Sequence, residues 1–433
     1  MCLGSVLTTR TDDEIQGEWK WWGSVRGKDD CIYGIPTNAR RVVKFNPVDK
    51  SMTEIGPDLG NAEWKWRDGV LADNGSIYCA PLNSNQVLKI DTINGTVTTL
   101  DAQVPQNGNF MWSTGALAMD KCIYFMPAHA HRILKVNPED DSVNTVGDDL
   151  GEGFKYSGAV AVNDGSIFGI PHECSTVIRF DPVTELISSV GEEAEEELLC
   201  CTGVLVNGYI YAASHENHGL IKIDVVNNTY SFVRHSYLVQ SQTHEYDGWG
   251  SAIFGDDGCI YWPPYCSDHI LKFDTLTQIC SLVGSDFGDT CDKWCGGAVT
   301  SNGVIYCIPC SATQILVIDP FKEFTIMLKD DIEQHPEDLG RLFAKNEQGM
   351  TTFESALIKY GSDRVFKAIE DCVPDHIPCG GINLQPFMVA ALCENSAVSV
   401  IYHFLRSNPN ALFTNHDDIN CEGGMVWDHD ASS

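Results

Sequence analysis

Residues 68–100 read DGVLADNGSIYCAPLNSNQVLKIDTINGTVTTL, and this stretch decides the fold. Its β-branched and aromatic residues come in short runs, which are typical of β-strands. Asn74-Gly75 and Asn94-Gly95 separate two pairs of runs, and both dipeptides suit hairpin turns because Asn and Gly tolerate a positive φ. The stretch therefore predicts an antiparallel unit of four strands. The expected strands are 68–72, 76–80, 86–91 and 96–100.

The same sequence pattern recurs along the chain, with an Ile-Tyr pair (once Ile-Phe) in its second expected strand. The pairs are Ile32-Tyr33, Ile77-Tyr78, Ile123-Tyr124, Ile167-Phe168, Ile210-Tyr211, Ile260-Tyr261 and Ile305-Tyr306. Successive pairs are 45, 46, 44, 43, 50 and 45 residues apart. A period of about 45 residues is typical of four-stranded propeller blades. We expect a mainly β chain in which residues 1–330 form a seven-bladed β-propeller. The blades should lie near 19–60, 61–105, 106–150, 151–194, 195–240, 241–288 and 289–330.

The closing blade has two candidates for its fourth strand. Residues 4–9 resemble the last strand of a repeat, and residues 324–328 follow the seventh repeat directly. The sequence leaves both open.

These repeats resemble seven-bladed propellers of the NHL, senescence-marker-protein and streptogramin-lyase-like type, including repeat proteins of unicellular algae. The resemblance implies the architecture. It leaves the activity open, because such rings host lyases, lactonases and pure interaction domains.

The sequence pattern changes after Asp330, where helical periodicity replaces strand alternation. Residues 351–360 and 362–372 are expected to form two amphipathic helices. Residues 384–391 resemble the opening of an ankyrin repeat. We expect a small α-helical, ankyrin-like segment at 331–413 and a flexible C-terminal tail at 414–433.

The chain is strongly acidic, with a formal net charge of −32. This charge argues against binding to nucleic acid or to an anionic membrane surface. The start of the chain lacks the basic and apolar regions of a signal peptide, so a cytoplasmic location is expected. The 18 cysteines are expected to be thiols. A zinc site is a weaker alternative, at Cys291, Cys295, Cys307 and Cys310.

Two equivalent positions lie next to each other at the start of the first strand in most repeats, one mostly aromatic and the one before it mostly lysine. The residues at these positions are candidates for binding a glycan, a small molecule or an anion. Aromatic rings and ammonium groups together can stack on such a ligand and neutralise it. The competing interpretation is that the rings wedge between blades. The candidate residues are Trp21, Trp66, Trp112, Tyr156 and Trp294 with Lys20, Lys65, Lys155 and Lys293. Gly248 falls in the aromatic column in the sixth repeat.

Histidines and glutamates gather in the loops after the second strands of repeats three to six. Imidazole and carboxylate are the ligands of zinc- or iron-type sites, which can activate water. The competing interpretation is a polar rim, because equivalent loops of neighbouring blades diverge. The candidate ligands are His129, His131, His172, Glu173, His215, Glu216, His218 and His269.

The propeller and the helical tail together predict a non-catalytic protein-interaction or scaffold protein. No cofactor is expected. The first alternative is a metal-dependent lyase or lactonase-like hydrolase that uses a divalent metal on the histidine-rich loops. The second alternative is glycan or anion binding by the columns of aromatic residues and lysines.

Overall fold

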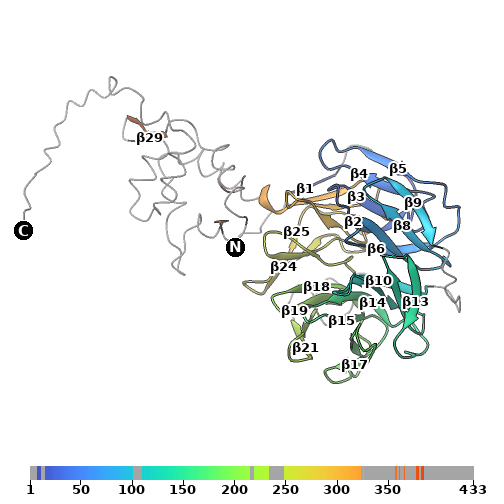
Figure 1. The fold of residues 1–433 in the computed structure, drawn as a ribbon. Coiled ribbons are helices and arrows are strands. Elements are labelled where there is room, and N and C mark those ends of the chain that lie inside the picture. Colours follow the sequence, from blue (N-terminus) through green and yellow to red (C-terminus); the bar gives the residue numbers. More distant parts are fainter. Residues whose placement is uncertain are drawn as a thin grey trace, which may run out of the picture. The chain divides into compact units, whose positions relative to one another are not determined.

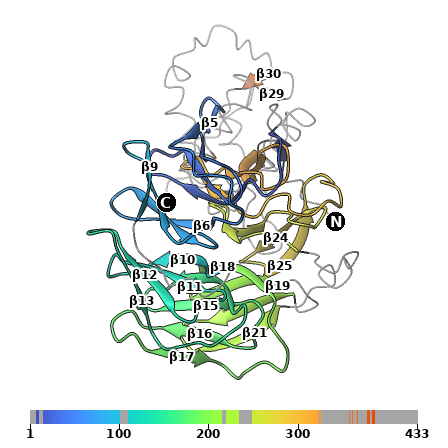
Figure 2. The same ribbon diagram turned by 90° about the vertical axis from the view of Figure 1, so that its right-hand side faces the viewer.

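The computed structural model describes residues 7–10, 15–100, 110–214, 219–233 and 248–322, together with eleven isolated or short-strand positions from 325 to 384. These residues form seven four-stranded antiparallel sheets, which confirms the seven-bladed propeller. We number the blades in chain order. The first strands of successive blades contact one another all the way round, from β2 to β26 and back to β2, so the ring is closed (Figures 1 and 2).

The strand bounds follow the repeats. Blade one is β2 (Trp21–Arg26), β3 (Ile32–Pro36), β4 (Val42–Phe45) and β5 (Met52–Ile55). Blade two is β6 (Trp66–Leu71), β7 (Ser76–Pro81), β8 (Val87–Asp91) and β9 (Thr96–Leu100). Blade three is β10 (Trp112–Leu117), β11 (Ile123–Pro127), β12 (Ile133–Asn137) and β13 (Ser142–Val146). Blade four is β14 (Tyr156–Ala161), β15 (Ile167–Pro171), β16 (Val177–Phe180) and β17 (Ile187–Val190). Blade five is β18 (Cys200–Val206), β19 (Tyr209–Ser214), β20 (Leu220–Asp224) and β21 (Thr229–Val233). Blade six is β22 (Ile253–Phe254), β23 (Cys259–Trp262), β24 (Ile270–Asp274) and β25 (Ile279–Val283).

Blade seven combines both ends of the propeller. It consists of β26 (Ala298–Val299), β27 (Ile305–Cys307), β28 (Leu316–Asp319) and the N-terminal strand β1 (Leu7–Arg10). β1 pairs antiparallel with β28, from Leu7 opposite Asp319 to Arg10 opposite Leu316. Residues 320–322 are helical, so the chain leaves the sheet after β28. The N-terminal segment therefore completes the ring and covers a strand edge that would otherwise be open.

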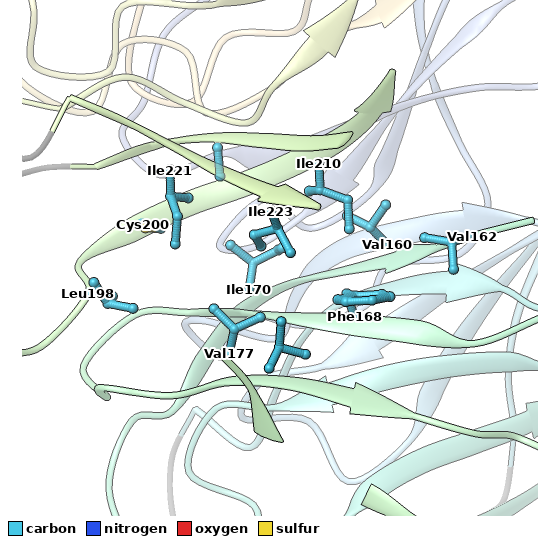
Figure 3. Packing of buried hydrophobic residues seen from close by; sticks show 12 residues of the cluster. Val160, Val162, Phe168, Ile170, Val177, Leu198, Cys200, Ile210, Ile221 and Ile223 are labelled. Atoms are coloured by element: carbon cyan, nitrogen blue, oxygen red, sulfur yellow. The ribbon is translucent and has the colours of Figure 1, made fainter. Parts of the chain in front are cut away.

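The hydrophobic core lies between neighbouring blades. Between blades four and five, Val160, Phe168 and Ile170 pack with Ile210 and Ile223, and all five are buried (Figure 3). Each blade turns one apolar face to each neighbour, which is why the strands carry apolar residues on both faces.

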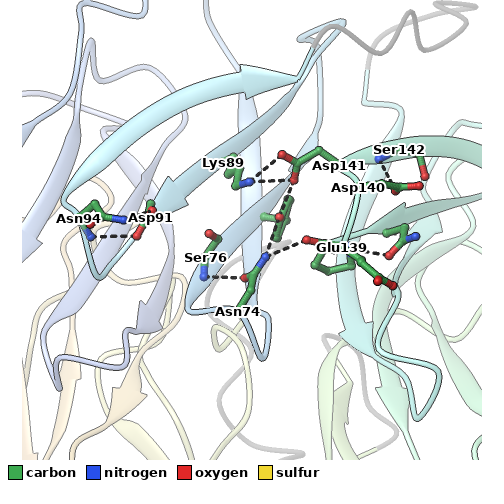
Figure 4. A network of polar contacts seen from close by, with 12 residues as sticks. Asn74, Ser76, Lys89, Asp91, Asn94, Glu139, Asp140, Asp141 and Ser142 are labelled. Atoms are coloured by element: carbon green, nitrogen blue, oxygen red, sulfur yellow. Dashed lines mark hydrogen bonds and ion pairs between the residues drawn. The ribbon is translucent and has the colours of Figure 1, made fainter.

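Polar contacts also link blades two and three (Figure 4). The side chain of Asn74 donates a hydrogen bond to the carbonyl of Pro138 at 2.9 Å. The hydroxyl of Tyr78 donates to Asp141 at 2.7 Å, and the Lys89 ammonium lies 2.7 Å from the same carboxylate. Asp141 of blade three thus binds two side chains of blade two. In three other blades the tyrosine donates to an aspartate of its own turn, as Tyr33–Asp29, Tyr124–Asp120 and Tyr261–Asp257.

The chain divides into two compact units, Met1–Glu323 and Phe324–Ser433. In the second unit, residues 356, 357, 360 and 365 are helical, and β29 (Ile377–Cys379) pairs with β30 (Ile382–Leu384). The remainder of the expected ankyrin-like segment and the C-terminal tail lie outside the described residues, so both stay predictions. Among the described residues, no helix combines the length and apolarity that crossing a membrane requires.

Candidate functional site

The aromatic column expected to bind a ligand is buried inside the blades. Trp66 is 3% exposed, and its indole N–H donates to the carbonyl of Gln86 at 2.8 Å. Four other indoles make the same bond to a carbonyl twenty residues further on. These are Trp21 to Arg41, Trp112 to Arg132, Trp249 to His269 and Trp294 to Gln314. Trp249, and not Gly248, therefore holds this position in blade six. Tyr156 is also buried. In these five blades the indole joins the start of the blade to the segment that leads into its third strand.

The lysines of the neighbouring column are buried as well. Lys65 is 3% exposed, and its ammonium donates to the carbonyls of Thr37 and Ala62 at 3.1 and 2.8 Å. Burial lowers the pKa of Lys20 and Lys65 to about 8. Lys20, Lys155 and Lys293 likewise donate to main-chain carbonyls. These ammonium groups are bound to loop carbonyls, and their role in ligand binding stays a prediction.

The accessible rings lie next to the buried column and form a continuous chain of aromatic contacts, which we call the aromatic arc. They come from the segments just before the first strands, from β2 itself, and from the loops after the second strands. The arc comprises Tyr265, Trp19, Trp22, Trp64, Phe110, His129, Phe154 and His172. All are partly buried except His129, which is exposed. The arc therefore offers aromatic surface at the end of the propeller where these loops meet.

Ring contacts within the arc are close. The ring centroids of Trp19 and Trp64 are 4.4 Å apart, and those of Trp64 and Phe110 are 5.4 Å apart. Phe154 lies between two imidazoles, with its centroid 5.4 Å from that of His129 and 4.5 Å from that of His172. These distances fall within the range of favourable aromatic pairs.

Three residues of the arc have strained backbones. Trp19, Trp64 and Phe110 have φ angles of 51°, 56° and 59°, in the left-handed region that bulky residues rarely adopt. Asn38 holds two of them, because its side-chain oxygen accepts from the Trp64 N–H at 2.8 Å while its own N–H donates to the Trp19 carbonyl at 2.9 Å. Asn83 does the same for Phe110 and Trp64. Strain of this kind persists only where the surroundings fix it, and it clusters at functional sites.

A single arginine reaches into the middle of the arc. In blade two the pairing of β6 with β7 shifts between Trp66 and Gly69, so Arg67 lies in a β-bulge. Bulges re-aim side chains. The guanidinium carbon of Arg67 lies 4.8 Å from the ring centroid of Trp22 in blade one and 5.7 Å from that of Phe154 in blade four. A group that reaches both blades from blade two must lie over the central channel.

The surroundings of Arg67 contain one carboxylate, that of Asp68, beside groups that are neutral at pH 7. The Nε atom is buried and has no hydrogen-bond partner among the residues that the structure describes. Its neighbours include Cys201, Cys295 and Tyr265. Burial raises the pKa of Cys201 to about 12 and raises those of Cys295 and Tyr265 above their ordinary values, so all three are protonated at neutral pH. Burial lowers the pKa of Arg67 itself, but an arginine stays protonated in proteins.

Asp68 lies on the other side of the bulge, in the channel. A cavity of about 260 Å³ there is lined mainly by Gly, Ala, Ser and Thr residues of the first strands. Asp68 accepts a hydrogen bond from the Gly69 N–H at 2.8 Å. Burial raises its pKa to about 6, against the opposing effects of that bond and of Arg67. A Cβ atom on Gly23 would lie 2.1 Å from Asp68 Oδ1, so glycine is required at that position.

Sequence reasoning missed the roles of Trp22, Arg67 and Tyr265. An alignment of the repeats would have singled out Arg67, because it is the sole charged residue at the position directly after the aromatic column. The residues of that column are Trp22, Arg67, Ser113, Ser157, Cys201, Gly250 and Cys295.

The histidine-rich loops point in different directions. His129 and His172 contact Phe154 in the arc, and Glu173 is exposed. His131 instead lies 3.2 Å from Asp149 and 3.3 Å from Glu152. His269 lies 2.8 Å from Asp268. Within the described part of the chain, no three His, Cys, Asp or Glu side chains could hold a metal together. His215, Glu216 and His218 lie outside that part, so their proposed role stays a prediction.

One cysteine pair corrects the expectation of thiols throughout. Cys266 and Cys291 form a disulfide between a blade-six loop and the segment that enters blade seven. Cys291 is therefore not free to join Cys295, Cys307 and Cys310 in a zinc site, and these three are buried thiols. The disulfide lies next to Tyr265 of the arc and fixes its loop.

Comparisons with known proteins agree on the fold. A streptogramin B lyase structure is similar over 72% of this chain and 97% of its own, with a TM-score of 0.59 and 11% identity. A catalytically inactive virginiamycin B lyase from Staphylococcus aureus with quinupristin gives the same TM-score at 10% identity, over 72% of this chain and 99% of its own. The extracellular domain of a putative hybrid two-component system from B. thetaiotaomicron has a TM-score of 0.54 at 10% identity, over 71% and 39%. No family model and no curated protein matches the chain. At these identities the similarity shows the propeller fold alone.

Proposed function

We propose that this chain is a non-catalytic interaction protein that binds a protein partner through the aromatic arc. The observation that carries the proposal is a set of partly accessible aromatic rings held on strained backbones around one arginine. Tryptophan, tyrosine and arginine dominate the energetics of protein interfaces, because they bury large areas at a low entropic cost. The residues from 331 onward are proposed as a second binding segment.

Affinity capture with the full-length tagged chain tests this proposal. The double variant Trp19→Ala/Trp64→Ala removes two adjacent rings of the arc. Phe254→Ala is the matched control, because Phe254 is 41% exposed and lies at the turn end of β22, away from the arc. We expect the double variant to lose the captured partner by about tenfold or more, as interface hot spots do, and the control to retain it. Retention of the same partner by both variants would overturn the proposal.

The alternative is a propeller enzyme that uses histidines for acid–base or metal chemistry. The observation that favours it is the placement of His129 and His172 on either side of Phe154 within the arc. Metal analysis of the purified chain separates the two functions. Stoichiometric metal that is lost on His129→Ala or His215→Ala would favour the enzyme, and substoichiometric metal that these variants do not change would favour the interaction protein.

A further inference from the structure

We infer that the centre of the arc receives a carboxylate that the protein partner carries beside an apolar side chain, with Arg67 as the cation that binds it. The inference rests on the proposed function and names the chemistry of the group that enters the ring.

The first step is the charge of Arg67. Among the described residues this guanidinium forms no ion pair, and its Nε donor is buried without an acceptor. A desolvated charge without an ion pair is costly, as is a buried donor without an acceptor. A bound anion would offset both costs. The adjacent carboxylate of Asp68 interacts electrostatically with Arg67 but forms no ion pair with it, and it accepts a hydrogen bond from the Gly69 N–H.

The second step is the geometry around the guanidinium. Trp22 and Phe154 place aromatic faces 4.8 and 5.7 Å from its carbon. Such faces stabilise a cation but provide no strong hydrogen-bond acceptor, so the N–H donors stay available. The planar fork of an arginine matches the two oxygens of a carboxylate. The site is therefore preorganised for a planar anion.

The third step is the selection among anions. The chain carries a net charge of −32, which repels polyanions such as nucleic acids. One cation inside an apolar ring matches a single negative charge. The aromatic arc around it matches an apolar side chain next to that charge. A carboxylate beside an apolar group satisfies both conditions.

Calorimetric titration of the full chain with two peptides tests the inference. The peptides are acetylated Ala-Ala-Phe with a free carboxylate and the same peptide with a C-terminal amide. We expect the carboxylate form to bind about tenfold more tightly or better, as a charge-assisted hydrogen bond would predict. Equal affinities of the two peptides would overturn the inference, and this comparison needs no variant of the protein.

Two variants refine the test. Arg67→Met keeps the length of the side chain and removes its charge, so it should abolish the preference for the carboxylate. Arg26→Met is the control, since Arg26 lies at the opposite end of the same kind of first strand and pairs with Asp30. It should leave the preference unchanged. A preference that survives Arg67→Met would also overturn the inference.

The outcomes separate the inference from the proposed function. If neither peptide binds while the Trp19→Ala/Trp64→Ala variant still loses its partner, the arc binds proteins but not through a carboxylate, and the inference fails alone. Phenylacetate carries a carboxylate beside an aromatic ring but is not a peptide. If it binds and the peptide does not, the carboxylate does not come from a protein partner. Loss of the carboxylate preference on Arg67→Met, with retention on Arg26→Met, supports the full inference.

Discussion

Trp21 and Trp22 are adjacent in the sequence but belong to different parts of the molecule. Trp21 is 4% exposed, donates its indole N–H to Arg41, and has counterparts in the other blades. Trp22 is partly exposed, stacks on Trp19, and has no aromatic counterpart at its position. The repeated residue holds the blade together, whereas the unrepeated residue contributes to the arc. The arc thus combines rings from a repeated position, such as Trp19 and Trp64, with residues that occur once, such as Trp22 and Arg67.

The largest effect is expected for a residue of the buried column. Trp66→Ala removes a buried indole and its hydrogen bond to Gln86. Such a change should lower the free energy of unfolding by about 3 to 5 kcal/mol. Denaturant unfolding of this variant beside Trp64→Ala, its neighbour in the arc, provides the measurement. Equal losses in the two variants would break the distinction between the buried column and the arc.

The disulfide gives the next effect, because it joins Cys266, a buried residue of the loop that carries Tyr265, to Cys291 in the segment that enters blade seven. It closes a loop with a sequence separation of 25 residues. Removing it with Cys266→Ser should cost about 3 kcal/mol through the entropy of the unfolded chain. Cys291→Ser should cost the same, and the double variant should cost no more. Thermal melts that show additive losses would contradict a shared bond.

Asp68 follows Arg67 in the sequence and lines the channel, and its titration should make the free energy of unfolding depend on pH. Its folded pKa of about 6 lies above the ordinary value of 3.8, so the folded chain binds more protons between these pH values. The native state therefore loses stability as the pH rises through this window, and above pH 6 the cost is fully present. Asp68→Asn should stabilise the chain by about 2 to 3 kcal/mol at pH 7, and by about 1 kcal/mol less at pH 5. Unfolding curves at the two pH values measure this, and a pH-independent difference would exclude the titration of Asp68 as the cause.

The smallest effect concerns the strained backbone of the arc. Trp64 has a φ of 56°, which a glycine adopts without cost. Trp64→Gly should therefore be more stable than Trp64→Ala by about 1 kcal/mol, although both lose the same ring. At Trp66, which lies in a regular strand, the order should reverse. An alanine variant that is the more stable at both positions would remove the evidence for stored strain.

The sequence predicts the ring well and the arc poorly. The spacing of the Ile-Tyr pairs counts the blades correctly, because each pair lies in a buried second strand. The choice of Gly248 for the aromatic column was wrong, because Trp249 precedes Ile260 by 11 residues, just as Trp66 precedes Ile77 by 11. An alignment singles out Arg67 as a charged residue, but its contacts with blades one and four depend on the closed ring and cannot be predicted from the local sequence. The Cys266–Cys291 bond likewise depends on loops that meet only in the closed ring.

The most direct test of the division between buried column and arc is fluorine NMR of the chain labelled with 5-fluorotryptophan, titrated with the acetylated Ala-Ala-Phe carboxylate. Single Trp→Phe variants assign the resonances. The resonances of Trp19, Trp22 and Trp64 should shift on titration, whereas those of the buried column should not. The buried column here comprises Trp21, Trp66, Trp112, Trp249 and Trp294. Shifts confined to the buried column, or no shift in the three arc tryptophans, would contradict the assignment of binding to the arc.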